Sequence, residues 1–140
     1  MERVAGTDDE AELWMVVAII QPFKLDAVTM ALEGINGFGG MTVTLCRGFG
    51  RGKSRRAEPN APVGARRRMT DTGLTDFTEK VKLEIAVAGR AQSRRVVEAI
   101  VHAAHTGNRG DGKVFVWPFA QATRIRTFEA DAIALRGHDE

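Results

Sequence analysis

Tyrosine is absent from this sequence of 140 residues, and cysteine occurs only once, at Cys46. A single cysteine excludes an intrachain disulfide framework and a zinc site built from cysteines. The missing tyrosine excludes any regulation through a tyrosine hydroxyl. Long apolar runs are also missing, because Met15–Ile20 is far shorter than a membrane span. Residues 1–12 are polar and contain no signal region, so we expect a cytoplasmic protein with a flexible N-terminal extension.

Positive charge is concentrated in one part of the chain. The formal net charge is +2, but residues 51–68 contain seven basic residues and one acidic residue, Glu58. This segment therefore carries +6 and the remainder of the chain −4. A basic arm on a slightly acidic body indicates a partner with an acidic or phosphate-bearing surface, and a solubilising loop is the alternative. The predicted partner-binding cations are Lys53, Arg55, Arg56, Arg66, Arg67 and Arg68.

The most informative motif is the glycine-rich run TGNRGDGK over Thr106–Lys113. Such a loop directs backbone N–H groups at an anion, and Lys113 adds a point charge suited to a phosphate. The glycine and lysine spacing nearly matches a P-loop, but Val114 stands where Ser or Thr would hold Mg²⁺. The apolar, β-branched residues 114–119 also predict a strand rather than a helix. The run therefore predicts a phosphate-binding loop outside the P-loop NTPases, with a simple hairpin turn as the alternative.

Hydrophobic periodicity predicts four strands and two helices. The expected strands are 13–21, 41–50, 80–87 and 114–117, and the expected helices are 22–35 and 92–105. Residues 52–79 have no period and indicate a long loop, which is usually functional or disordered. Residues 121–127 alternate around Arg124 and Arg126, which places these two side chains on the same side of a strand. We expect the tail 128–140 to be mobile.

The order of these elements predicts an α+β fold of the ferredoxin-like βαββαβ type. Such a fold has one antiparallel sheet with both helices on one face. The other face would expose Phe49, Phe115, Trp117 and Phe119, which are too apolar to be left in water. The pattern therefore predicts self-association through the uncovered face.

Five segments in this order resemble the PII signal-transduction proteins, the nitrogen regulatory P-II family. They are AIIQPFKLDAV at 18–28, GMTVTLCRGFGR at 40–51, KVKLEIAV at 80–87, TGNRGDGKVFV at 106–116 and RIRT at 124–127. The resemblance implies one PII-like domain over 13–127 and a homotrimer whose three sheets face inward. It also implies an exposed T-loop over 52–79, between the second and third predicted strands. That loop would dock onto a transporter, an enzyme or a regulator, and a transporter would give a peripheral contact with a membrane protein.

The same resemblance implies that ATP or ADP binds in clefts between subunits, with AMP as a further candidate. Glycines would let the backbone approach the nucleotide, side chains from neighbouring strands would surround the base, and cations would reach the phosphates. Two of those cations, Arg124 and Arg126, would come from the adjacent subunit, although an ordinary surface ion pair is the alternative for each. The residues implied for nucleotide binding are Ile19, Thr42, Gly48, Phe49, Gly50, Arg51, Glu84, Ala86, Gly110, Asp111, Gly112, Lys113, Arg124 and Arg126.

Three departures from the family pattern concern its nitrogen role. Gly52 stands where the family has a glutamine that helps hold the Mg²⁺ through which 2-oxoglutarate binds, and glycine has no side chain to coordinate a cation. Lys80, the candidate small-anion contact, is retained, so we predict weak or absent 2-oxoglutarate binding and leave a role for Mg²⁺ open. Without tyrosine, uridylylation of the T-loop is impossible. The loop is also long and basic, so we expect disorder without a partner and a partner other than the usual one.

We therefore expect a nucleotide-sensing regulator and not an enzyme. A nucleic-acid-binding protein that uses the arginine-rich loop is the alternative, but no aromatic residue is interleaved with these arginines for base stacking. A slow ATPase is the third hypothesis. Asp111 could serve as its base, but an aspartate inside a glycine turn more often shapes the loop. We expect no metal site, because His102 and His105 have no neighbouring cysteine.

Overall fold

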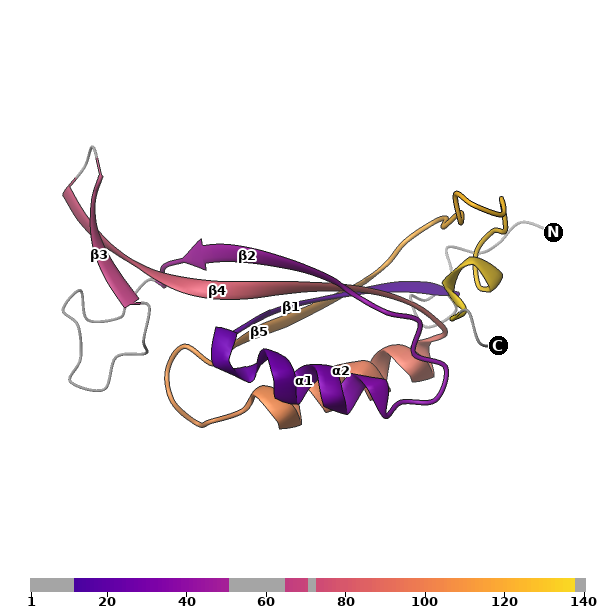
Figure 1. Cartoon of the computed structure of the whole chain (residues 1–140), viewed down its shortest axis with the longest axis horizontal. Coiled ribbons are helices and arrows are strands. Elements are labelled where there is room, and N and C mark those ends of the chain that lie inside the picture. The colour runs from indigo at the N-terminus through magenta and orange to yellow at the C-terminus, as the bar shows by residue number, and fades with distance from the viewer. Residues whose placement is uncertain (1–11, 51–64, 71–72, 138–140) are drawn as a thin grey trace, which may run out of the picture.

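The computed structural model describes residues 12–50, 65–70 and 73–137, and shows one sheet with two helices on one face (Figure 1). In the sheet the strands lie in the order β2-β4-β1-β5, with β3 paired to β4, and every pair is antiparallel. The predicted ferredoxin-like fold is confirmed. The elements are β1 (Leu13–Ile20), η2 (Pro22–Lys24), α1 (Leu25–Glu33), β2 (Thr42–Gly48), β3 (Ala65–Thr70), β4 (Gly73–Ala88), α2 (Arg90–Ala104), β5 (Gly112–Pro118) and η3 (Ile133–Leu135).

The core forms between the helices and one face of the two central strands, β1 and β4. Alternate residues of each strand point into it, as the two-residue period of a strand requires. Helix α1 contributes Val28 and Leu32, and α2 contributes Val96 and Ile100, all fully buried. The strand residues of the core are Trp14, Val16, Ala18, Ile20, Val81, Leu83, Ile85 and Val87.

Neither α1 nor α2 covers the opposite face of the sheet (Figure 1). On β5 the residues that alternate with the core-facing Val114 and Val116 are Phe115 and Trp117, which are 48% and 45% exposed. Phe115 lies opposite Val17 and Trp117 opposite Met15, so apolar side chains continue across two strands of this open face. Self-association through this face stays a prediction.

The prediction that residues 52–79 form an irregular loop is wrong over 65–70 and 73–79. Here β3 and the first half of β4 form an antiparallel hairpin whose innermost pair is Thr70 and Gly73. The predicted strand 80–87 is thus the second half of a 16-residue strand. The hairpin projects beyond the two helices (Figure 1). Neither helix packs on it, so its sequence needs no apolar face toward them, and the alternation that identifies a half-buried strand is absent.

The C-terminal predictions also need correction. Residues 121–127 do not form a strand: residues 125–127 form a turn, which an isolated bridge between Thr123 and Ala130 closes. The tail predicted to be mobile is folded over 128–137 and includes η3. Its carbonyl at Leu135 approaches the backbone of Gly39 so closely that a Cβ at Gly39 would overlap it. No helix in the described part of the chain is long and apolar enough to cross a membrane.

Candidate functional site

The glycine-rich loop joins the end of α2 to the start of β5. Its three glycines, Gly107, Gly110 and Gly112, have φ values of +88°, +94° and +106°. Side chains disfavour this region, so the loop path depends on glycine. At Gly112 a second constraint applies, because a Cβ there would overlap the carbonyl oxygen of Ile19 on the neighbouring strand. The loop conformation is therefore set by backbone sterics.

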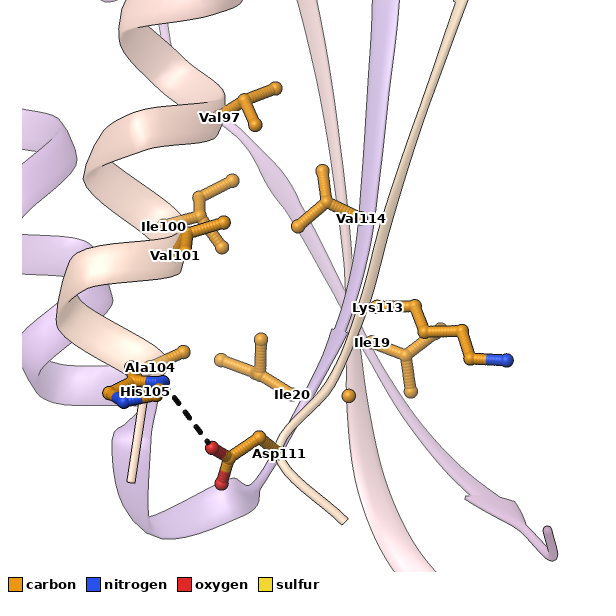
Figure 2. Close-up of a pocket in the computed structure, with 11 residues that line it drawn as sticks. Ile19, Ile20, Val97, Ile100, Val101, Ala104, His105, Asp111, Lys113 and Val114 are labelled. Carbon is orange, nitrogen blue, oxygen red and sulfur yellow. Dashed lines mark ion pairs between the residues drawn. The ribbon is translucent and has the colours of Figure 1, made fainter. Parts of the chain in front are cut away.

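Asp111 closes this loop with its side chain. The carboxylate accepts hydrogen bonds from the Thr106 N–H at 2.7 Å, the Gly107 N–H at 2.9 Å and the Thr106 hydroxyl. The Nδ1 atom of His105 lies 3.9 Å from it (Figure 2). Partial burial raises the pKa of Asp111, but the bonds from Thr106 and Gly107 and the nearby His105 outweigh it, so the net pKa lies below 3.8. These contacts favour a loop-shaping role for Asp111 over that of a base.

Several predicted base-contacting residues share the open face of the sheet. Thr42 of β2 lies directly opposite Glu84 of β4, and Ile19 of β1 lies opposite Lys113 of β5. The side chains of Ile19 and Lys113 point away from α2, as Figure 2 shows. Ala86 lies on the same face, opposite Met15. Glu84 forms a 3.6 Å ion pair with Lys82.

The end of β2 presents Gly48, Phe49 and Gly50 at the base of the T-loop. The exposed ring of Phe49 meets the ring of Phe77 edge to face, with centroids 5.2 Å apart. Phe77 was missed from the sequence because it lies in the segment predicted to be a loop. Arg51, Lys53, Arg55 and Arg56 lie outside the described residues. Arg66, Arg67 and Arg68 form consecutive positions of β3.

Lys80, the predicted small-anion contact, connects two parts of the site. Its Nζ atom donates a hydrogen bond to the carbonyl oxygen of Gly110, so β4 is tied to the glycine-rich loop. Lys80 lies opposite Cys46 of β2, on the strand that continues into the hairpin. The Lys80 side chain therefore links the glycine-rich loop to the strand that leads into the hairpin.

The second cluster of predicted residues lies in the C-terminal turn, defined here as residues 124–131. The guanidinium of Arg124 bonds to Glu129 Oε1 at 3.2 Å, to the carbonyl of Ala134 at 3.1 Å and to the carbonyl of Arg136. The backbone N–H of Phe128 donates to the carbonyl of Arg124 at 2.8 Å. Arg124 is thus engaged in holding the turn, whereas Arg126 is exposed. The prediction that these arginines share one side of a strand is wrong, because tight turn geometry replaces the strand.

The two clusters lie at opposite ends of the sheet. Gly112 lies beside Ile20, where β1 ends, whereas the Phe119 N–H bonds to the carbonyl of Leu13, where β1 begins. At about 3.3 Å per residue, the intervening strand spans on the order of 20 Å. The C-terminal turn lies beyond that second end, far from the loop after α2 (Figure 1). Within one chain Arg126 and the glycine-rich loop cannot bind the same phosphates.

A single antiparallel sheet with two helices on one face, a glycine-rich loop and a projecting hairpin define a small α+β protein of the ferredoxin-like class. Residues 13–129 match the model of the nitrogen regulatory protein P-II family. The chain is 46% identical to nitrogen regulatory protein P-II of Rhizobium etli over 86% of this chain and 98% of the relative. It is 44% identical to the protein of that name from a Synechocystis species, with 86% and 97% covered.

A solved structure supports the same assignment. The chain resembles Arabidopsis thaliana PII bound to citrate with a TM-score of 0.67 and 31% identity, over 91% of this chain and 93% of that one. The chain therefore belongs to the nitrogen regulatory protein P-II family, whose members are regulatory signalling proteins.

Proposed function

We propose that this protein is an adenine-nucleotide sensor that regulates a target protein through its T-loop. The observation that carries the proposal is the conformation of the glycine-rich loop. Its backbone requires glycine at positions of positive φ, and a side chain at position 112 would overlap the carbonyl of Ile19. A chain that keeps such a conformation beside Lys113 has the parts of a phosphate-binding loop. The open-face residues Thr42 and Glu84 supply polar groups for the base.

Two copies of the chain are needed for one complete site. The glycine-rich loop and Arg126 lie at opposite ends of one sheet, so a ligand that uses both must lie between subunits. A cyclic, head-to-tail arrangement brings the loop end of one subunit to the turn end of the next, and closure gives a ring. The homotrimer implied by the family resemblance is such a ring, and its inward-facing sheets would cover Phe115 and Trp117.

The nucleotide state would reach the target through Lys80 and β4. Because Lys80 bonds to the Gly110 carbonyl, phosphates that move the loop also move the strand that leads into the hairpin. The basic residues of that hairpin and of the T-loop favour an acidic target surface on a transporter, an enzyme or a regulator.

The small-molecule response is proposed to differ from that of the family. The Nζ atom of Lys80 is hydrogen-bonded to the Gly110 carbonyl, and Gly52 offers no side chain to a metal ion. We therefore expect 2-oxoglutarate to bind weakly or not at all. The relative from Arabidopsis thaliana binds citrate in its structure, which makes other small carboxylates worth testing on this chain.

Isothermal titration with ATP, ADP and AMP, each with and without 2-oxoglutarate and Mg²⁺, tests the proposal. We expect saturable nucleotide binding that 2-oxoglutarate does not strengthen. Lys113→Gln should weaken binding about tenfold or more, since a charge-assisted contact contributes roughly 1.5–3 kcal/mol. Arg95→Gln, which removes an exposed cation of α2, is the control and should leave affinity unchanged. Failure of the native protein to bind any of the three nucleotides would contradict the proposal.

A further inference from the structure

His105 lies where α2 ends and the glycine-rich loop begins. Its backbone N–H donates to the Val101 carbonyl at 3.0 Å, and its own backbone is extended, so the helix stops here. The Nδ1 atom of its imidazole is 3.9 Å from a carboxylate oxygen of Asp111 (Figure 2). The Nε2 atom lies 3.8 Å from the position that a Cβ at Gly107 would take. The side chain is 69% exposed, so its charge follows the pH of the solvent.

The carboxylate of Asp111 joins the two ends of the loop. It accepts hydrogen bonds from Thr106 and Gly107, which begin the loop, and all of these donors are neutral. Because the pKa of Asp111 lies below 3.8, the carboxylate stays ionised near neutral pH. An imidazole, in contrast, is the side chain that changes charge between about pH 5 and 8. Within this pair the imidazole is therefore the group that responds to pH near neutrality.

The other elements around His105 supply no second acidic partner in the described part of the chain. On β5 the side chain of Lys113 points away from α2 (Figure 2), and on β4 the Nζ atom of Lys80 is bonded to the loop carbonyl of Gly110. Strand β1 contributes apolar side chains here, Ile19 and Ile20. The remaining titratable or charged groups near His105 along α2 and in the loop are all exposed: Glu98, His102 and Arg109. Asp111 is thus the ion-pair partner of His105 in the described structure.

We infer that His105 positions the glycine-rich loop through Asp111 and thereby makes the phosphate affinity of the loop sensitive to pH. Protonation places an imidazolium beside the carboxylate, which favours the loop form in which Asp111 is bonded to Thr106 and Gly107. The C-terminal end of α2 also favours a cation at this position.

The direction of the pH effect follows from this pairing. A ligand that binds one loop conformation binds more tightly as that conformation becomes more populated. The affinity for phosphates is therefore highest when the imidazole is protonated, and the contribution of His105 is lost as pH rises. This consequence rests on the proposed nucleotide function, whereas the positioning of the loop does not.

Titration with ATP at about pH 6 and about pH 8, on either side of the histidine range, tests the inference. His138 lies outside the described residues, so His138→Gln is introduced into every protein compared and serves as the parent. His105→Gln should weaken binding about threefold at the acid pH and leave it unchanged at the alkaline pH, since an exposed ion pair shifts an equilibrium by a few-fold. The matched control is His102→Gln, which removes an exposed histidine one turn earlier on α2 and should match the parent at both pH values.

The comparison is made between proteins at the same pH because the terminal phosphate of ATP also changes charge near pH 6. His105→Arg separates the charge from the imidazole, since a guanidinium stays charged throughout this range. This variant should keep the higher, acid-side affinity at both pH values. A pH profile that His105→Gln leaves unchanged, or that His102→Gln alters equally, would overturn the inference.

Solvent exchange of the Thr106 and Gly107 amides, measured by NMR without nucleotide, reports on the loop itself, because both N–H groups donate to Asp111. Protection of these amides should be about threefold higher in the parent than in His105→Gln at the acid pH, and equal in the two proteins at the alkaline pH. Equal protection at both pH values would overturn the inference.

The two proposals fail separately in these experiments. Amide protection that depends on His105 in a protein that binds no nucleotide would support the positioning of the loop and contradict the nucleotide sensor. ATP binding that does not depend on His105 at either pH would contradict the inference alone.

Discussion

Different interactions hold the proposed binding residues at the two ends of the sheet. At one end, positive-φ glycines and the carboxylate of Asp111 set the path of the glycine-rich loop. At the other end, the guanidinium of Arg124 holds the C-terminal turn through side-chain and carbonyl contacts. The first end presents backbone groups and Lys113, and the second presents the exposed guanidinium of Arg126.

This difference determines how each part of the proposed composite site responds to substitution. A loop that is held by backbone sterics loses its conformation after a single substitution, since a Cβ at Gly112 has no alternative position. A turn that is held by several side-chain hydrogen bonds loses stability gradually as single groups are removed. Substitutions at the two ends should therefore differ in kind as well as in size.

The largest effect is expected from Gly112→Ala. The new Cβ overlaps the Ile19 carbonyl in a strained backbone conformation, which should lower the free energy of unfolding by about 3 kcal/mol and abolish phosphate binding. Denaturant unfolding and nucleotide titration measure both effects. Gly48→Ala is the control for stability, since a Cβ at Gly48 meets no heavy atom within 4 Å. Equal stability of the two variants would contradict the steric account.

The next effect distinguishes the two arginines of the turn. Arg126→Gln should weaken ATP binding about tenfold to a hundredfold and leave the free energy of unfolding unchanged, because its side chain is exposed. Arg124→Gln should also speed hydrogen exchange in the turn, since it removes bonds to Glu129 and Ala134. Titration and hydrogen exchange of both variants, with Arg95→Gln as the control, provide the test. Identical behaviour of the two would contradict their separate roles.

A smaller effect concerns the pH dependence of the loop. The pKa of Asp111 is lowered from 3.8 in the folded protein, so its carboxylate contributes stability above that value and loses it as pH falls through the lower, folded pKa. Asp111→Asn should therefore be less stable by about 1–2 kcal/mol near neutral pH, and the difference should shrink below pH 3.8. Urea unfolding between acid and neutral pH measures it. A difference that grows on acidification would contradict the assignment.

The smallest effect is expected at the base of the T-loop. The edge-to-face pair of Phe49 and Phe77 should have a coupling free energy of about 0.5–1.5 kcal/mol. A double-mutant cycle with Phe49→Leu, Phe77→Leu and both together measures it. Additive single effects would show that the contact does not stabilise the hairpin.

Much of the fold could be predicted because its core obeys simple periods. The alternation of Val81, Leu83, Ile85 and Val87 identified half of β4, and helical spacing identified α1 and α2. The hairpin of β3 and β4 could not be predicted because it projects beyond the two helices, so its sequence does not need the alternate apolar residues that mark a half-buried strand.

The candidate site was predicted in part. Glycine spacing identified the loop after α2. The structure adds the reason for glycine at position 112, because a Cβ there would overlap the carbonyl of Ile19. The engagement of Arg124 by Glu129 and by carbonyls of the tail could not be predicted, because it depends on a turn with positive φ at Phe128 and Asp131, residues that give no such signal. The separation of the two clusters likewise follows only from the strand register.

Mixed oligomers test the central claim, that one site is built from the loop of one chain and the turn of another. Subunits with Lys113→Gln and subunits with Arg126→Gln would be unfolded together, refolded together and titrated with ATP. In a closed ring the mixed species contain a site that combines an intact loop with an intact turn. The account predicts that native-affinity binding returns in the mixture although each variant alone binds weakly. Binding in the mixture no tighter than in the separate variants would contradict it.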